Sequence, residues 1–293
     1  ESDVPMPGEA DRQQYIDWAL EERGDLCRRH ADVAPTALAT NTAGLNYTQL
    51  RTIRADVREN QNRLTPDTLS DLKKEFIEAE AYGMLEFIET DNSLDLIAGH
   101  NEAKDHLRQA AHAVQTGQHD VLPMGYLVSG PVGCGKTFLI NCFAGEIGIP
   151  MVKLKNFRSQ WQGVTEGNLE KILNLLEAMT PVAVMIDEAD AALGDRDAQG
   201  DSGVSQRVFS QIVSFMSDPA HRGRVIFFLV TARPDLMPVD LKRQGRAEEH
   251  LSLFYPHSRE DREELLTVMM DRTGVDLPMD AVPPELLGGE RTY

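Results

Sequence analysis

The sequence predicts an α/β fold in which a parallel sheet is flanked by helices. From Gly125 onward, short apolar runs rich in branched residues alternate with segments of helical periodicity. Such runs are typical of strands that are buried on both faces of a parallel sheet. Before Gly125 the apolar residues recur at three- and four-residue spacing, which indicates helices. The chain has 293 residues, 41% of them hydrophobic, so one large or two modest domains can form a core.

The N-terminal part, residues 9–90, is expected to form helices with breaks at Pro35, Gly44 and Pro66. Thr65-Pro66-Asp67 predicts a helix start, because threonine is a good N-cap and proline fits the first turn. This part therefore predicts an all-helical segment.

Four strands are expected farther along, at Tyr126–Val128, Met151–Leu154, Val182–Ile186 and Val225–Val230. Helical patterns separate them, at Thr137–Ile147, Asn168–Met179 and Ser205–Met216. Pro256 then breaks the pattern, and Arg259–Met270 predicts one more helix, the start of a partial C-terminal lid.

The composition is acidic, with 47 Asp and Glu against 29 Lys and Arg and a net charge of −18. An acidic surface repels phosphate backbones, so no nucleic-acid partner is expected, and the charge favours solubility. The three cysteines show neither disulfide nor metal spacing, which favours a reducing, cytoplasmic compartment. No apolar run reaches membrane-spanning length, so no membrane segment is expected.

Gly130-Pro131-Val132-Gly133-Cys134-Gly135-Lys136-Thr137 fits the phosphate-binding P-loop pattern in full. It follows an expected strand and opens an expected helix, which argues against a chance glycine-rich turn. The glycines let backbone N–H groups face the phosphates, and the helix N-terminus adds positive potential. Lys136 would reach the β- and γ-phosphates, and the Thr137 hydroxyl would bind Mg²⁺. The sequence thus predicts a P-loop NTPase fold with ATP and Mg²⁺ as cofactors.

Two carboxylates, Asp187 and Glu188, end the expected strand Val182–Ile186. Carboxyl ends of parallel strands face the ligand crevice of an open α/β sheet. Asp187 would hold Mg²⁺ through water, and Glu188 would act as the base that polarises the attacking water. A solvated acidic turn is the alternative, since Asp190 follows, but the P-loop upstream favours the catalytic interpretation.

Three further motifs surround this site: Leu96-Ile97-Ala98-Gly99 before the first expected strand, Thr231-Ala232-Arg233-Pro234-Asp235 after the last, and then Leu241-Lys242-Arg243-Gln244-Gly245-Arg246. Together with the P-loop and the two carboxylates, these motifs resemble the AAA family of ATPases, the group that holds NSF, katanin and the proteasomal ATPases. The resemblance covers about residues 92–275.

The resemblance implies where the nucleotide binds and how it is hydrolysed. It implies nucleotide contacts from Ile97, Gly99, Pro131, Val132, Gly133, Cys134, Gly135, Lys136, Thr137 and Phe138. It also implies that Arg243 and Arg246 are arginine fingers that reach the γ-phosphate on a neighbouring subunit. From their spacing alone, these two arginines would instead be interpreted as part of a basic turn on the surface. Arg207, with the helix to Met216, resembles an element that signals between subunits.

One position departs from the family pattern. The family usually has asparagine where this chain has Ala232, and that asparagine helps to orient the attacking water. Thr231 is adjacent, but neighbouring strand residues point to opposite faces, so it is no simple substitute. ATP binding is still expected, whereas hydrolysis is either slow or served by another polar group.

Trp161-Gln162-Gly163 lies where AAA unfoldases carry a pore loop that grips extended polypeptide. The flat ring of Trp161 gives sequence-tolerant contact area, whereas Gln162 departs from the usual apolar residue. Burial of Trp161 in the core is the alternative. We favour the pore-loop interpretation, because this tripeptide lies between the second strand and the next helix, where the pore loop comes in the order of the family's motifs.

The first fifty residues are similar to the region after the ATPase core, and Leu38–Leu50 resembles the family's lid segment. The expected domains are therefore a helical segment over 1–65 resembling the lid of a preceding AAA module, a linker helix over 66–91, the nucleotide-binding domain over 92–256 and the start of a lid over 257–293. A private helical domain of the same module is the alternative for the N-terminal part.

The resemblance implies an ATPase that remodels or unfolds a protein substrate, with or without an adaptor, as a homo-oligomeric ring, commonly of six subunits. An ATP-gated assembly scaffold with slow hydrolysis is a rival, favoured by Ala232. A nucleic-acid motor is a weaker rival because of the acidic balance and because no basic stripe with interleaved aromatics is present.

Overall fold

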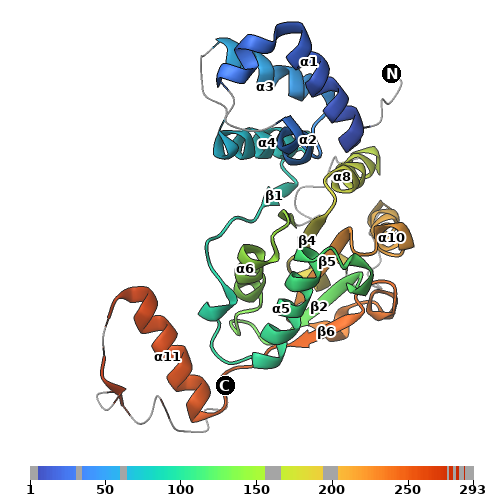
Figure 1. Ribbon diagram of the computed structural model, residues 1–293. Coiled ribbons are helices and arrows are strands. Elements are labelled where there is room, and N and C mark those ends of the chain that lie inside the picture. Colours follow the sequence, from blue (N-terminus) through green and yellow to red (C-terminus); the bar gives the residue numbers. More distant parts are fainter. Residues whose placement is uncertain are drawn as a thin grey trace. The chain divides into compact units, whose positions relative to one another are not determined.

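The computed structural model describes residues 6–30, 35–59, 65–155, 166–193, 204–275, 277–279, 282–283 and 287. The chain divides into two compact units (Figure 1). The first contains the described residues within 1–87, 152–182 and 200–215, and the second those within 88–151, 183–199 and 216–293. Each unit is described by itself.

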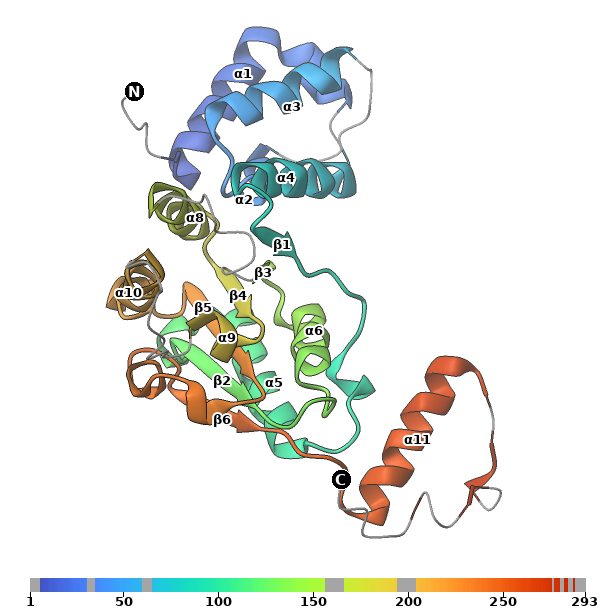
Figure 2. The same cartoon turned by 180° about the vertical axis from the view of Figure 1, so that it is seen from behind.

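The N-terminal part of the first unit is all helical, as predicted (Figures 1 and 2). Its helices are α1 (Glu9–His30), α2 (Pro35–Asn41), α3 (Tyr47–Glu59) and α4 (Pro66–Glu80). Their buried apolar side chains form a core of their own, including Ile16, Leu45, Leu50, Ile53, Leu69 and Ile77. Burial of this kind is the main source of stability for short helices.

Polar contacts fix these helices to one another. Arg12 on α1 is buried, and its guanidinium donates to the carbonyl oxygens of Pro7 and Ala39 at 2.7 and 2.9 Å. The helix start expected at Pro66 is confirmed, because the Thr65 side chain accepts from the backbone N–H of Thr68 in a reciprocal capping box.

A linker helix was expected over 66–91. The prediction is wrong beyond Glu80, where the helix ends. Helix α4 ends at Glu80, where Tyr82 and Gly83 adopt left-handed backbone conformations and the Gly83 N–H donates to the carbonyl of Glu78 at 2.8 Å. Left-handed residues directly after the C-cap, here Ala81, end a helix in this way. The next residues form strand β1 (Leu85–Phe87), which pairs antiparallel with β3 (Met151–Leu154).

The sheet has six strands in the order β1-β3-β4-β5-β2-β6 and is mostly parallel. Besides β1 and β3, its strands are β2 (Gly125–Ser129), β4 (Val182–Ile186), β5 (Val225–Thr231) and β6 (Glu249–Ser252). The four expected strands are thus confirmed, and β1 and β6 are additional. Strand β2 pairs in parallel with both β5 and β6.

Helices alternate with these strands, which confirms the predicted α/β class. They are α5 (Asn101–Gln115), α6 (Lys136–Ile147), α8 (Glu166–Ala178), α9 (Ala189–Leu193), α10 (Val204–Met216) and α11 (Arg259–Thr273). Short 3₁₀ turns lie at Leu94–Leu96, His119–Val121, Pro219–His221, Pro234–Leu236 and Val239–Lys242. Within the described residues, no helix combines the length and apolar character needed to cross a membrane.

The core of the second unit lies between helices α5 and α6 and strands β2 and β5. Tyr126 and Phe228 are cross-strand neighbours whose rings stack at 4.8 Å, and Phe143 of α6 packs on Phe228 at 5.4 Å. Aromatic pairs of this kind add to the burial energy of a core. This packing fixes the strands, so that the segments following β2, β5 and β6 meet at one edge of the sheet.

Candidate nucleotide-binding site

The loop between β2 and α6 has a backbone that depends on glycine. Gly130, Gly133 and Gly135 have φ values of 155°, 84° and 90°. A Cβ at Gly130 would lie 2.2 Å from the carbonyl oxygen of Leu253, so no other residue fits there without backbone movement. Since the loop leads directly into helix α6, its N–H groups and the helix dipole suit phosphate oxygens.

Lys136 and Thr137 are the first two residues of α6 and lie within this loop's reach. The Lys136 ammonium donates to the carbonyl oxygens of Gly130 and Pro131 at 2.8 and 2.7 Å. The Thr137 hydroxyl lies 3.5 Å from each carboxylate oxygen of Asp187, at the end of β4. The two expected metal ligands are therefore brought together.

This pair has the chemistry that Mg²⁺ requires, one hydroxyl and one carboxylate at a phosphate loop. Among the described residues, no group of three or more His, Cys, Asp or Glu side chains could hold a metal ion. A Mg²⁺ ion between Thr137 and Asp187 would take its remaining ligands from phosphate oxygens and water, as it does with nucleotides.

Glu188 follows Asp187 in a strained backbone conformation. Its φ of 48° lies in the left-handed region, which costs a residue other than glycine about 1–3 kcal/mol. The Glu188 N–H donates to the Asp187 carboxylate at 3.0 Å, and its carbonyl accepts from Ala191 and Ala192 at the start of α9. These bonds hold the turn, and Glu188 is exposed.

A cavity of about 360 Å³ lies beside the loop. Six of the expected nucleotide contacts line it: Ile97, Gly99, Gly133, Cys134, Gly135 and Phe138. The other four, Pro131, Val132, Lys136 and Thr137, lie on the loop and the first turn of α6. Tyr255 also lines the cavity, and its hydroxyl donates to the Val132 carbonyl at 2.5 Å. The cavity thus adjoins the phosphate loop, as an adenine pocket would.

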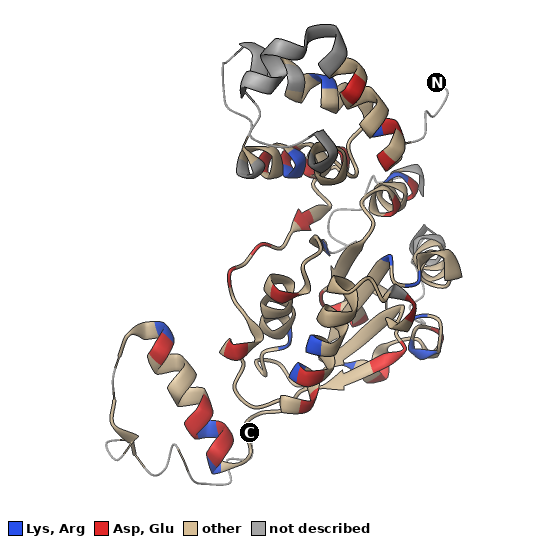
Figure 3. Ribbon diagram, in the orientation of Figure 1, with Lys and Arg blue, Asp and Glu red and all other residues tan. Residues whose placement is uncertain are grey.

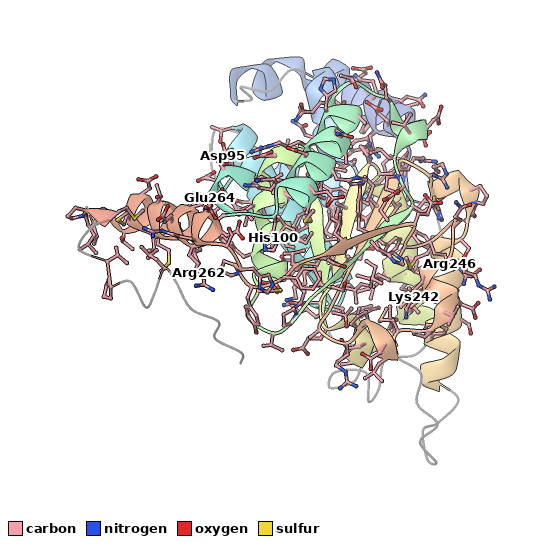
Figure 4. All side chains as sticks on the ribbon, turned by 90° about the horizontal axis from the view of Figure 1, so that it is seen from below. Asp95, His100, Lys242, Arg246, Arg262 and Glu264 are labelled. Atoms are coloured by element: carbon pink, nitrogen blue, oxygen red, sulfur yellow. The ribbon has the colours of Figure 1, made fainter. Side chains whose placement is uncertain are left out.

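Two charged residues that the sequence did not single out hold the backbone of Ile97 and Gly99, which line the cavity. The Lys104 ammonium is buried; it donates to the Ile97 carbonyl at 2.8 Å and contacts Glu264 of α11 at 3.3 Å. Glu264 also accepts from the Gly99 N–H at 3.0 Å. Figure 4 shows Glu264 near His100, the residue just before α5. These contacts tie α11 to Ile97 and Gly99, which are expected to contact the nucleotide.

His100 adds no positive charge to this wall at neutral pH. Burial lowers the pKa of His100 from its ordinary value, and Lys104 lowers it further, against the opposing effects of Asp261 and Glu264. Its backbone has a φ of 50° at the N-cap position of α5, with no side-chain cap. A neutral imidazole here leaves Lys104 as the cation that Glu264 faces.

Strand β5 ends at Thr231, and Ala232 follows it. Ala232 is the position at which the AAA family usually has asparagine. The Thr231 hydroxyl donates to the Asp190 carboxylate at 2.6 Å and accepts from the Arg233 N–H at 2.9 Å. Thr231 is also buried. Its hydroxyl is therefore engaged in holding α9 to β5, and Ala232 brings no polar side chain to this strand end.

The two expected arginine fingers lie on one turn but differ in their contacts. Arg243 has a side chain that is 67% exposed and pairs with Asp240 at 3.2 Å. Arg246 donates to the Ser217 hydroxyl and to the Asp240 carbonyl, each at 2.6 Å. Figure 4 shows Arg246 beside Lys242, away from Glu264 and His100. Arg243 is thus the residue of the two that is available to another molecule.

The expected pore residues Trp161 and Gln162 lie outside the described residues, so the pore stays a prediction. The backbone of Arg207 lies in α10, but its side chain is likewise outside the described part of the chain.

Comparison with protein families identifies two segments. Residues 126–255 match the family described as ATPase family associated with various cellular activities (AAA). Residues 10–82 match the family described as AAA+ chaperone, second helical domain.

Curated relatives are AAA-type proteins. The chain is 28% identical over 229 residues to an uncharacterized AAA domain-containing protein, ycf46, of Trieres chinensis, covering 75% of this chain and 45% of that protein. It is 31% identical over 170 residues to cell division control protein 48 homolog C of Arabidopsis thaliana, covering 54% and 20%. It is 29% identical over 205 residues to the ATP-dependent zinc metalloprotease FtsH 1 of Salinibacter ruber, covering 67% and 29%. The chain thus spans less than half the length of these relatives.

Proposed function

We propose, from the premise that this chain belongs to the AAA family of ATPases, that it is the Mg-ATP-driven motor part of a protein-remodelling ring. The observation that supports this most is the convergence of Lys136, Thr137 and Asp187 at a glycine-dependent loop beside a cavity. This arrangement suits a nucleoside triphosphate with its metal, and the AAA domain supplies the reaction class, hydrolysis of ATP to ADP and phosphate.

Each residue has a defined role in this proposal. Bound Mg-ATP would supply the phosphoanhydride bond and the divalent charge. The loop N–H groups and Lys136 hold the phosphates, and Lys136 exchanges its bonds to the Gly130 and Pro131 carbonyls for phosphate oxygens. Thr137 and Asp187 hold the metal. Glu188 accepts a proton from the attacking water.

Assembly into a ring, commonly of six subunits in this family, completes the site. Arg243 balances the charge that develops on the γ-phosphate bound by the neighbouring subunit. Its exposure and its weak hold by Asp240 support this assignment. FtsH 1 of Salinibacter ruber is by its name an ATP-dependent protease, which supports a protein substrate for this chain as well.

The N-terminal helices extend the proposal to a tandem organisation. We assign the segment over 1–65 to the lid of a preceding AAA module, and the family match over 10–82 supports this and adds α4 to it. The domain over 92–256 would then be a second module, with its own lid starting at 257. The helical N-domain private to one module is the weaker alternative.

A slow ATPase that gates assembly is the second candidate, and Ala232 favours it because Thr231 is engaged by Asp190. Ala232→Asn is expected to raise the ATP turnover rate about 10²-fold, since one well-placed polar group near the reacting atoms is worth about 10²–10³ in rate. Steady-state phosphate release measures it, with Ala232→Ser as a smaller polar control. An unchanged rate in both variants would show that the site does not lack this group.

Nucleic-acid driven motion is disfavoured. Figure 3 shows basic residues dispersed among acidic ones over the described chain, and the net charge is −18. A track of phosphates would meet repulsion over most of this surface.

Trp161→Ala tests the remodelling function. We expect ATP turnover to stay within about twofold, while unfolding of a stably folded protein that carries an unstructured tail falls at least about tenfold, because the gripping ring is lost. The two assays are steady-state turnover and substrate proteolysis in the presence of a trace protease. Trp161→Tyr, which keeps an aromatic ring, should retain remodelling.

A melting experiment separates this result from loss of packing. If Trp161 were a core residue, the alanine variant would lose about 3–5 kcal/mol of stability. A large fall in melting temperature would therefore contradict the pore assignment. Turnover stimulated by single-stranded DNA but not by unfolded protein would contradict the proposed substrate class.

A further inference from the structure

Several contacts fasten the turn that carries Arg243 and Arg246, and one of them comes from the carboxylate of Glu248. Glu248 Oε1 accepts from the Gly245 N–H at 2.7 Å, in the middle of the turn. Glu248 Oε2 accepts from the Met124 N–H at 3.3 Å, just before β2. The carboxylate therefore links the turn to the strand that leads into the P-loop.

Arg222 forms a bidentate ion pair with the Glu248 carboxylate. Its two terminal nitrogens donate to the two carboxylate oxygens at 2.5 and 3.2 Å, and one of them also reaches the Leu122 carbonyl at 3.1 Å. The Glu248 side chain is only 15% exposed, against 38% for Arg222. A bidentate, partly buried ion pair of this kind fixes the orientation of the carboxylate far better than a single exposed ion pair does.

The carboxylate of Glu248 stays ionised at neutral pH. Burial raises the pKa of Glu248, but hydrogen bonds from Arg222, Gly245 and Met124 together outweigh it, so the pKa lies below its ordinary value. Gly245 has a φ of 82°, and a Cβ there would meet nothing within 4 Å. The N–H of Gly245 is thus held by Glu248, and the bonds of Arg246 to Ser217 and to the Asp240 carbonyl hold the turn at the next residue.

We propose that Glu248, braced by Arg222, is a positioning residue for hydrolysis on the neighbouring subunit, because it fixes the turn from which Arg243 projects. This inference rests on the proposed function, in which Arg243 acts across the subunit interface. A group that stabilises a transition state must be held within about 0.5 Å of its productive place. Arg243 itself has an exposed side chain, so its aim depends on its backbone.

Glu248→Gln removes the charge and keeps the shape. We expect ATP turnover to fall about 10–100-fold, because a small misplacement of a reacting group costs that much, while the Kd for a fluorescent ATP analogue stays within about twofold. Glu249→Gln is the matched control. Glu249 is the next residue on β6, its side chain is 47% exposed, and it faces His106 at 3.9 Å. This control is expected to keep parental turnover.

Mixed assemblies decide whether the defect acts across the interface. Glu248→Gln protomers are mixed with Lys136→Ala protomers, and co-assembly is verified by pull-down through a tag on one partner. At one kind of mixed interface an intact P-loop meets an intact turn, so activity should return. Mixtures that stay inactive, or a Glu248→Gln ring that hydrolyses ATP at the parental rate, would overturn the inference.

A parallel mixture separates failure of this inference from failure of the proposed function. Arg243→Ala with Lys136→Ala should also regain activity. If it does and the Glu248 mixture does not, the positioning role alone is wrong; if neither regains activity, the finger in trans is wrong as well. Should Glu248→Gln fail to assemble, Arg222→Lys replaces it. That variant keeps the charge but loses the bidentate contact, and the same restoration is expected.

Discussion

Glu188→Gln is expected to bind ATP as tightly as the parent and to hydrolyse it about 10²–10⁴-fold more slowly. The amide cannot accept a proton from water, whereas Lys136, Thr137 and Asp187 remain in place. Glutamine is close in shape to glutamate and meets the same backbone strain at a φ of 48°, so the fold should be unchanged. Single-turnover hydrolysis and equilibrium binding of a fluorescent ATP analogue measure the two effects.

The neighbouring carboxylate provides the control for this variant. Asp187→Asn removes the expected metal ligand, so it should weaken Mg²⁺-dependent binding as well as hydrolysis. The two adjacent changes therefore have different signatures. Parental turnover in Glu188→Gln would refute its assignment as the base, and identical binding defects in both variants would show that the two carboxylates share one role.

The P-loop site could be predicted from the sequence because each of its signals lies in contiguous residues. Gly130–Thr137 specifies the glycine-dependent backbone and contains the residues expected to hold phosphate and metal, and the apolar run Val182–Ile186 places Asp187 at a strand end. The edge strands gave weaker signals. Strand β6 consists of Glu249, His250, Leu251 and Ser252, with one buried residue, so no apolar run marks it.

The contacts that fasten the site could not be predicted, because they join residues distant in sequence. Glu264 meets Gly99 across 165 positions, and nothing in the pattern of α11 distinguishes Glu264 from Glu263, which pairs with Arg259 instead. The linker helix failed for a local reason. Helical periodicity continues to Ile77, but the left-handed turn at Tyr82 and Gly83 stops it.

Arg243→Ala is expected to lower ATP turnover about 10³–10⁵-fold, the range for loss of an arginine finger, with ATP binding retained. The loss is large because the charge that develops on the γ-phosphate then lacks a cation that is already in place when the charge forms. Arg246→Ala should have a smaller effect on turnover and a measurable effect on stability, since Arg246 is bonded to Ser217 and to the Asp240 carbonyl. Phosphate release and thermal melting distinguish the two variants.

Arg259→Ala is the matched control for the Arg243 variant, because Arg259 is an exposed arginine in a similar ion pair, 2.7 Å from Glu263. It should keep parental turnover. Dilution provides a second test, because a site completed by a neighbour loses activity when the assembly dissociates. Parental turnover per chain should therefore fall at protein concentrations where mass photometry shows single chains. Full activity of single chains, or parental turnover in Arg243→Ala, would contradict an arginine supplied by the next subunit.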